Sequence, residues 1–158
     1  LPRLRRFAVA LAGQRELAED LLQSAVERAL RNWGTFQTGR RLDSWMFKIM
    51  QNHWIDTRRA EANAATQTFD DIDLPGEDGR EIVEARDDVR AAHSAFAALP
   101  EDQRTVLALI VIEELSYAEA ADALSVPIGT IMSRLSRARA AMAALMQRAV
   151  FAKVRKEN

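Results

Sequence analysis

Residues 115–139, LSYAEAADALSVPIGTIMSRLSRAR, contain two helical patterns separated by a short turn. Ser116 and Glu119 form an S-x-x-E capping box, which predicts a short helix over residues 117–124. The tripeptide SVP that follows predicts a tight turn, and Pro127 suits the start of a second helix. Apolar residues recur there at spacings of three and four and predict one buried seam, formed by Ile128, Ile131, Leu135, Ala138, Met142 and Leu145.

The outward face of this second helix is polar and basic. Outside the seam, its early positions are Thr130, Ser133, Arg134, Ser136 and Arg137. Arginine can bridge guanine acceptors in the major groove or bind a phosphate, and small hydroxyl residues permit close approach. The segment therefore predicts a DNA-binding helix-turn-helix. A helical hairpin with arginines added for solubility is the alternative.

Helical periodicity extends over most of the chain, and no run alternates between apolar and polar residues. Gly13 interrupts the first segment, and helices are predicted over residues 16–33 and 42–59. A helix over residues 88–99 precedes Pro100, which opens a central core helix. The predicted buried positions are Leu17, Leu21, Leu22, Ala25, Val26, Ala29 and Trp33 in the first of these helices, and Val106, Leu107, Leu109, Ile110, Val111 and Ile112 in the central one.

Residues 62–86 lose the helical pattern. This stretch is acidic and contains Pro75, Gly76 and Gly79, and its central acids are Asp70, Asp71, Asp73, Glu77 and Asp78. Such a composition predicts a flexible acidic linker. The expected fold is all-α, with two small helical domains at residues 1–61 and 87–158.

Charge alternates along the chain although the net charge is −1. Residues 1–61 carry +4, residues 62–90 carry −6, residues 91–126 carry −5 and residues 127–158 carry +6. Two basic blocks are compatible with two anion-binding surfaces, because phosphate attraction depends on local charge. Ordinary solvated helix faces are the alternative.

Composition excludes several classes of site. The chain has no cysteine, which excludes disulfides and thiolate metal sites, and its two histidines exclude a histidine-rich metal centre. No metal or other cofactor is expected. No apolar run reaches the ~18–20 residues of a membrane span, and no secretory signal is evident. We therefore expect no membrane insertion and a cytoplasmic location.

Three stretches resemble a known family. LPEDQRTVLALIVIEELSYAEAADALSVPIGTIMSRLSRAR (residues 99–139) resembles the −35-binding domain, region 4, of extracytoplasmic-function (ECF, group 4) RNA polymerase sigma factors. AEDLLQSAVERALRNW (18–33) resembles the family's polymerase-binding helix, and RRLDSWMFKIMQNHWIDTRR (40–59) its −10-reading helix, both in region 2. The GTIMSRLSRAR version, with Met132, is similar to the general-stress subgroup. The resemblance covers nearly the whole chain.

The resemblance implies roles for individual residues in binding promoter DNA. In the −35 helix, Ser133, Ser136 and Arg137 match base-edge positions and Arg134 and Arg139 lie nearer the phosphates, while Thr130 contacts phosphate or caps the helix. In the −10 half, Phe36 and Asn52 match positions that hold a base flipped from the non-template strand, through stacking and edge hydrogen bonds. Candidate backbone contacts there are Lys48, Arg58 and Arg59. Core packing is the expectation for Trp45, Ile49 and Trp54.

The resemblance also implies protein partners. Asp20, Leu21, Gln23 and Arg28 match positions that contact core RNA polymerase, and Ser24 stands where the family often has an acid. An anti-sigma factor is expected to occlude these surfaces until a signal arrives. A sigma-like decoy that binds an anti-sigma factor without binding DNA is the main alternative, and a simple helix-turn-helix regulator is another. No residues suggest an enzyme.

Overall fold

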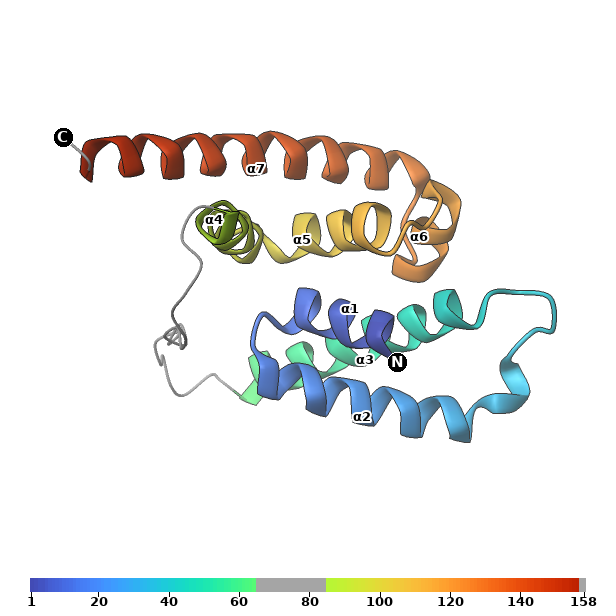
Figure 1. Ribbon diagram of the computed structural model, residues 1–158. Helices are drawn as coiled ribbons and strands as arrows, with labels where there is room; N and C mark the ends of the chain where they lie inside the picture. The colour runs from blue at the N-terminus through green and yellow to red at the C-terminus, as the bar shows by residue number, and fades with distance from the viewer. Residues whose placement is uncertain (65–84, 157–158) are drawn as a thin grey trace.

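The computed structural model describes residues 1–64 and 85–156 of the 158-residue chain. Every regular element in these residues is helical, which confirms the all-α prediction. The predicted linker lies almost entirely outside the described residues. The elements are α1 (Pro2–Ala12), α2 (Arg15–Arg31), the 3-10 turn η1 (Trp33–Thr35), α3 (Leu42–Ala64), α4 (Ala85–Ala97), α5 (Glu101–Leu107), the π-helical turn η2 (Ala108–Ile112), α6 (Tyr117–Leu124) and α7 (Ile128–Lys156) (Figure 1).

The first half is a three-helix unit. Gly13 ends α1 in the left-handed region at φ 72°, where glycine has no Cβ clash, and its N–H donates to the carbonyl of Val9 at 2.8 Å. Phe7 and Phe47 are fully buried, with ring centroids 4.8 Å apart in an edge-to-face arrangement. This contact joins α1 to α3 at the centre of the unit.

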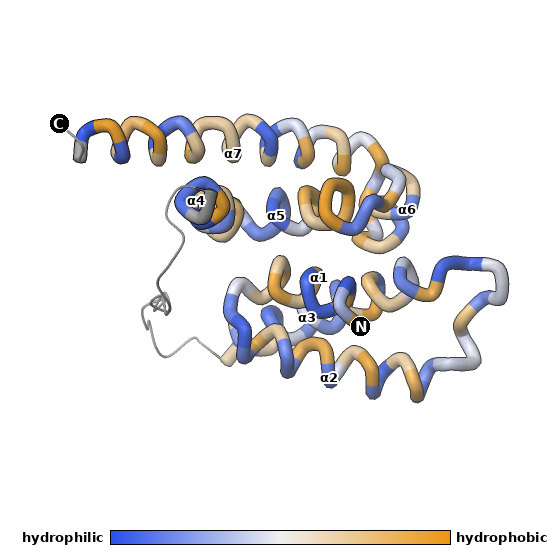
Figure 2. The backbone as a smooth tube through the Cα atoms, viewed as in Figure 1, coloured by the Kyte–Doolittle hydropathy of each residue, from blue (hydrophilic) through white to orange (hydrophobic). Residues whose placement is uncertain are grey.

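The second half contains the predicted helix-turn-helix. The Ser116 side chain accepts from the Glu119 N–H at 3.1 Å, and the Glu119 carboxylate accepts from the Ser116 N–H at 2.8 Å. This reciprocal pair confirms the capping box that begins α6. Ser125 ends α6 in the left-handed region, at φ 54°, and α7 begins three residues later. Hydrophobic residues recur among hydrophilic ones along the whole of α7, as expected for an amphipathic helix with one buried face (Figure 2).

The predicted buried stripes are correct in their middles and wrong at some ends. Leu17 on α2 and Trp33 in η1, which were predicted to share one buried stripe, are exposed, as is Ile128 at the start of α7. Val111 and Ile112 are also exposed, because the central helix changes from α5 into the π-helical turn η2 and their positions rotate out of the core. The other predicted positions are buried, except four that are half-buried against the core: Val26, Ile110, Met142 and Leu145.

The two halves pack against each other. α1 contacts α5 and η2, and α3 contacts α6 (Figure 1). Arg104 on α5 donates to the backbone carbonyls of Ala10 and Leu11 at the end of α1, the latter at 3.1 Å. Buried apolar residues of both halves form one continuous cluster. Consequently, in this arrangement the halves share a core.

Within residues 1–64 and 85–156, no helix combines the length and apolar character that crossing a bilayer demands. The same residues contain no group of three or more carboxylate or imidazole side chains placed to hold a metal ion.

Candidate nucleic-acid interface

The outward face of α7 displays the three residues predicted to read base edges. Ser133, Ser136 and Arg137 are exposed, whereas Ile131 and Leu135 on the opposite face are buried. The Arg137 guanidinium donates to the Ser133 carbonyl and to Ser133 Oγ, each at 3.3 Å. This one-turn contact orients the guanidinium along the helix surface.

The other predicted −35 residues lie toward the flanks of that face. At about 100° per residue, Arg134 and Arg139 are rotated to opposite sides of Ser133. Arg134 Nε is 3.4 Å from an Asp102 carboxylate oxygen on α5, which ties it to the domain body. Arg139 is exposed and lines a groove facing α1. Thr130, in the first turn, is half-buried, and its carbonyl accepts from Ser133 Oγ at 3.1 Å.

An aromatic cluster forms beside the start of α3. Phe36 stacks on Trp33 with ring centroids 5.6 Å apart and an interplanar angle of 27°, and it lies 5.3 Å from the Trp45 ring. Trp33 is 55% exposed, so the stack has a face open to solvent. Sequence reasoning missed Trp33 as a member of this cluster because its spacing fitted a buried stripe.

A pocket of about 240 Å³ adjoins the cluster. Its lining comprises Thr35, Phe36, Gln37, Arg40, Arg41, Ser44, Trp45, Lys48 and Asp122. Ser44 Oγ is buried in this lining without a hydrogen-bond partner in the described part of the chain, so it is a spare donor and acceptor. An aromatic wall, a free hydroxyl and three cations suit an unpaired base and its phosphates.

The remaining −10 candidates follow Lys48 along α3. Asn52 and Arg59 are exposed and share the face of Lys48, although Asn52 does not line the pocket. Arg58 points elsewhere: its guanidinium lies 5.7 Å from the Trp54 ring centroid and donates to Glu61 at 3.3 Å. The structure therefore brings Phe36 and Lys48 together and separates Arg58 from them.

Trp54 and its neighbour His53 place side-chain nitrogen atoms in the interior of the first half. Trp54 is buried, as expected, whereas Trp45 and Ile49 are half-buried. Burial lowers the pKa of His53, and the positive charge of Arg28 lowers it further. The negative charge of Asp56 raises this pKa but does not cancel the lowering. A neutral imidazole is therefore favoured between α2 and α3.

The predicted polymerase-binding residues divide between two faces of α2. Asp20 and Gln23 are exposed on one face, and Gln23 donates to Glu27 at 3.4 Å. Leu21 is only 4% exposed and packs in the core, so its side chain is not offered to a partner here. Arg28 is half-buried and pairs with Asp56 on α3 at 3.4 Å.

Side chains that the sequence did not single out connect the two halves. Glu113, 1% exposed, accepts from Arg3 Nε at 2.8 Å and Arg6 Nε at 2.9 Å. Arg3 also contacts Asp43 and the Glu113 carbonyl. We call Arg3, Arg6 and Glu113 the clasp. No local pattern could have identified it, because its partners lie 107 or more positions apart.

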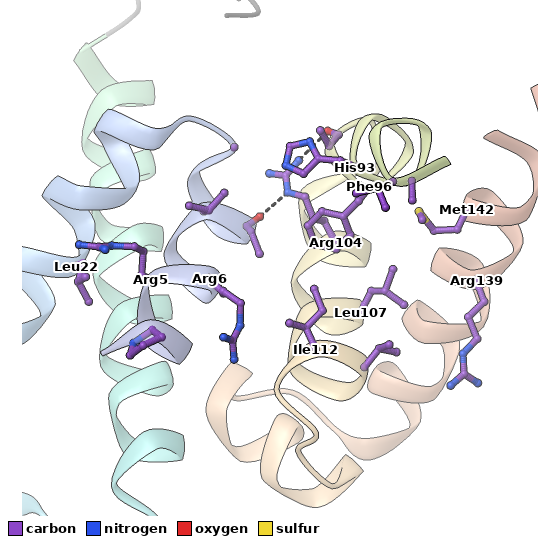
Figure 3. Close-up of a pocket in the computed structure, with 18 of the residues that line it drawn as sticks. Arg5, Arg6, Leu22, His93, Phe96, Arg104, Leu107, Ile112, Arg139 and Met142 are labelled. Carbon is purple, nitrogen blue, oxygen red and sulfur yellow. Dashed lines mark hydrogen bonds between the residues drawn. The ribbon is translucent and has the colours of Figure 1, made fainter. Parts of the chain in front are cut away.

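A groove of about 1230 Å³ runs between α1 and the second half (Figure 3). Val89, Phe96, Ile112 and Met142 give it apolar walls. Its cationic side chains are Arg5, Arg6, Arg104 and Arg139, drawn from both halves. The groove is thus apolar in its walls and basic at several points.

Two family models match the chain. One described as Sigma-70, region 4, matches residues 90–142, which include the helix-turn-helix. The other, described as the Sigma2 domain of PhyR, matches residues 1–51, which include the aromatic cluster. Each match therefore lies within one of the two halves.

Curated relatives and solved structures agree with these matches. The ECF RNA polymerase sigma factor EcfG of Rhodopseudomonas palustris (strain TIE-1) is 36% identical over 149 residues, covering 92% of this chain and 80% of the relative. The ECF RNA polymerase sigma factor SigM of Mycobacterium tuberculosis (strain H37Rv) is 34% identical over 144 residues, covering 90% and 71%. The sigma factor RpoE, solved with the anti-sigma factor NepR from Bartonella quintana, is 28% identical with a TM-score of 0.74, covering 92% and 91%. Since both family models and the curated relatives agree, the chain belongs to the ECF RNA polymerase sigma factors.

Proposed function

We propose that residues 1–61 of this ECF sigma factor are region 2, which binds core RNA polymerase and captures the opened −10 element, and that residues 87–158 are region 4, which reads the −35 element. Residues 62–86 would link them. The observation that carries this proposal is the outward face of α7, where Arg137 and two serines stand free of the core immediately after a capped α6. In a helix-turn-helix the second helix enters the major groove with such a face.

Opening of DNA would draw its energy from binding, because no group in this proposal performs chemistry. Docking on polymerase brings both DNA-binding halves to one promoter, so two weak contacts act as one. Pairing lost at the −10 element is offset when Phe36 stacks a flipped base and Ser44 Oγ or Asn52 bonds its edge. Lys48, Arg40 and Arg41 would hold the adjoining phosphates.

Run-off transcription on fragmented genomic DNA tests the proposal. Core polymerase with the purified chain should yield discrete transcript starts that share −35 and −10 elements and are absent without the chain. Arg137→Ala and Phe36→Ala should reduce those starts, whereas Arg148→Ala, an exposed arginine near the far end of α7, should not. Failure to produce any starts beside a working control sigma factor would favour the decoy alternative, which binds an anti-sigma factor without DNA.

We propose further that an anti-sigma factor binds the groove between the halves. The support is the solved RpoE–NepR complex, which shares this fold, together with the groove's chemistry. Apolar walls and arginines at its edges suit an amphipathic helix that carries acids beside its apolar stripe. Such a helix would hold both halves at once.

A genetic selection tests this site and identifies the partner at the same time. Host genomic fragments are screened for those that silence a reporter dependent on this sigma factor. Ile112→Asp, at an exposed position of the groove, should escape silencing while transcribing normally without the silencer. Val150→Asp, at a position that is also exposed (56% against 42% for Ile112) but outside the groove, should remain silenced. Silencing that ignores Ile112→Asp would place the partner elsewhere.

A further inference from the structure

Acidic side chains of α6 form ion pairs with the cationic side chains around the candidate −10 pocket. Asp122 Oδ1 lies 3.2 Å from Lys48 Nζ, and Asp122 Oδ2 lies 3.4 Å from Arg40 Nη1. Glu119 Oε1 is 3.4 Å from Arg41 Nη1. These acids belong to the second half of the chain and the cations to the first, so the pairs exist only while the halves are closed on each other.

Asp122 also forms part of the pocket wall. It lines the same 240 Å³ cavity as Phe36 and Trp45. Carboxylate oxygens accept from lysine and arginine in the way that phosphate oxygens do, so Asp122 and Glu119 compete with phosphate for these cations. A nucleic-acid strand approaching Phe36 would therefore meet a negative charge where it needs positive ones.

The clasp fixes this arrangement from another side of the interface. Exposed ion pairs such as Lys48–Asp122 contribute little individually. Glu113, by contrast, is removed from water and both of its charged partners come from α1. Separating the halves takes the arginines away from that carboxylate, so α6 is held over the pocket by more than its own surface charges.

We propose that the free chain is autoinhibited: Asp122 and Glu119 act as an internal substitute for promoter phosphates, and α6 must leave before the −10 pocket can bind DNA. This inference rests on the function proposed for that pocket. Polymerase docking, which spaces the two halves along a promoter, would then open the chain and release Lys48 and Arg40, whereas Arg41 would lose Glu119 but keep its 2.8 Å pair with Asp43 of its own half. The free protein is thereby kept from binding single-stranded nucleic acid.

Two readouts test the proposal on the full chain. The absence of native cysteines allows dyes to be attached at Ala64→Cys and Gln147→Cys, one exposed position in each half. Energy transfer between the dyes reports closure, and a fluorescent mixed-sequence 12-nucleotide single strand reports access to the pocket. Asp122→Asn frees Lys48 and Arg40 and should tighten probe binding about fivefold, with only a small loss of transfer because the clasp still joins the halves.

Matched variants separate the possible causes. Asp87→Asn removes the same charge from the second half and frees Lys153 instead, so it should change neither readout. Arg6→Gln should open the chain from the clasp without touching the pocket. Unchanged transfer and unchanged probe binding in both Asp122→Asn and Arg6→Gln would overturn the proposed autoinhibition. If transfer falls but adding Phe36→Ala leaves the tighter probe binding intact, closure of α6 over the first half is supported and the assignment of the pocket as the DNA site is wrong.

Discussion

Arg137 reaches back one turn of α7 to place its guanidinium 3.3 Å from Ser133 Oγ. The two side chains therefore form one exposed polar unit on the face proposed to enter the major groove. An arginine held in this way loses less rotamer freedom when it binds than one that is free in solution. Its orientation depends on the serine as well as on the backbone.

Arg137→Ala is expected to weaken binding to the −35 element by about 1–3 kcal/mol, because a bidentate base contact is lost. Ser133→Ala should cost less, since it removes only the orienting hydroxyl. The measurement is affinity of the reconstituted holoenzyme for a promoter found by run-off transcription, against a scrambled −35 element. Arg148→Ala serves as the control. Equal losses on both DNA sequences would indicate a phosphate contact instead.

Phe36→Ala is expected to slow promoter opening while leaving −35 binding intact. Base stacking on an aromatic ring contributes about 1–3 kcal/mol, and Trp33 and Trp45 would lose their shared neighbour. Permanganate reactivity of unpaired thymines near −10 measures the effect. Phe151→Ala, a 70% exposed aromatic on α7, is the matched control. If the Phe36→Ala protein opens the promoter at the normal rate, the pocket beside Phe36 does not bind the −10 element.

Substitutions on α2 should separate partner binding from folding. Asp20→Ala and Gln23→Ala change exposed side chains and should weaken polymerase affinity with little change in stability. Leu21→Ala should instead lower the free energy of unfolding by about 2–5 kcal/mol, because it leaves a cavity in the core. Denaturant titration and a polymerase binding assay, run on all three, test the division. A stable Leu21→Ala protein that fails to bind polymerase would mean the leucine turns outward in the complex.

The α6 cap should be sensitive to acid. The backbone hydrogen bond from Ser116 lowers the pKa of Glu119 below its ordinary value of 4.5, and Arg41 acts in the same direction. The stabilisation is therefore complete above pH 4.5 and is lost as the pH falls through the lower pKa of the folded protein. Glu119→Gln keeps a capping-box side chain but removes this titration.

Wild type should thus exceed Glu119→Gln in unfolding free energy at pH 7, by about 0.5–1 kcal/mol from the charge at the helix N-terminus. The gap should close below pH 4.5. Denaturant unfolding at several pH values measures it. If the difference in unfolding free energy between wild type and Glu119→Gln persists in acid, it comes from packing and not from the charge of Glu119.

Local patterns predicted the helices well because capping and periodicity act over a few residues. Ser116 with Glu119 placed the start of α6, and the three-and-four spacing of Ile131, Leu135 and Ala138 placed the buried face of α7. α3 continues to Ala64, past the predicted end at residue 59, since alanines and a glutamate sustain the helix after the apolar pattern stops.

The contacts between the halves were beyond the reach of such patterns. Glu113 and Glu114 look like a pair of solvated acids, yet the π-helical turn before them directs Glu113 inward and leaves Glu114 exposed at φ 55°. Asp122 looks like part of an acidic helix face, and its partner Lys48 is 74 positions away. A single sequence shows neither a change of helix type nor a pairing at that distance.

The clasp has a consequence for exchanging parts between relatives. A buried carboxylate from one half and two arginines from the other must be present together, since either set alone leaves charge without a partner. A chimera that joins this first half to a −35 domain lacking the acid would carry promoter specificity without the closed resting state. The two halves are therefore matched to each other at the clasp. Exchanging one half with that of a relative would first disrupt closure of the free protein, even where promoter recognition is unchanged.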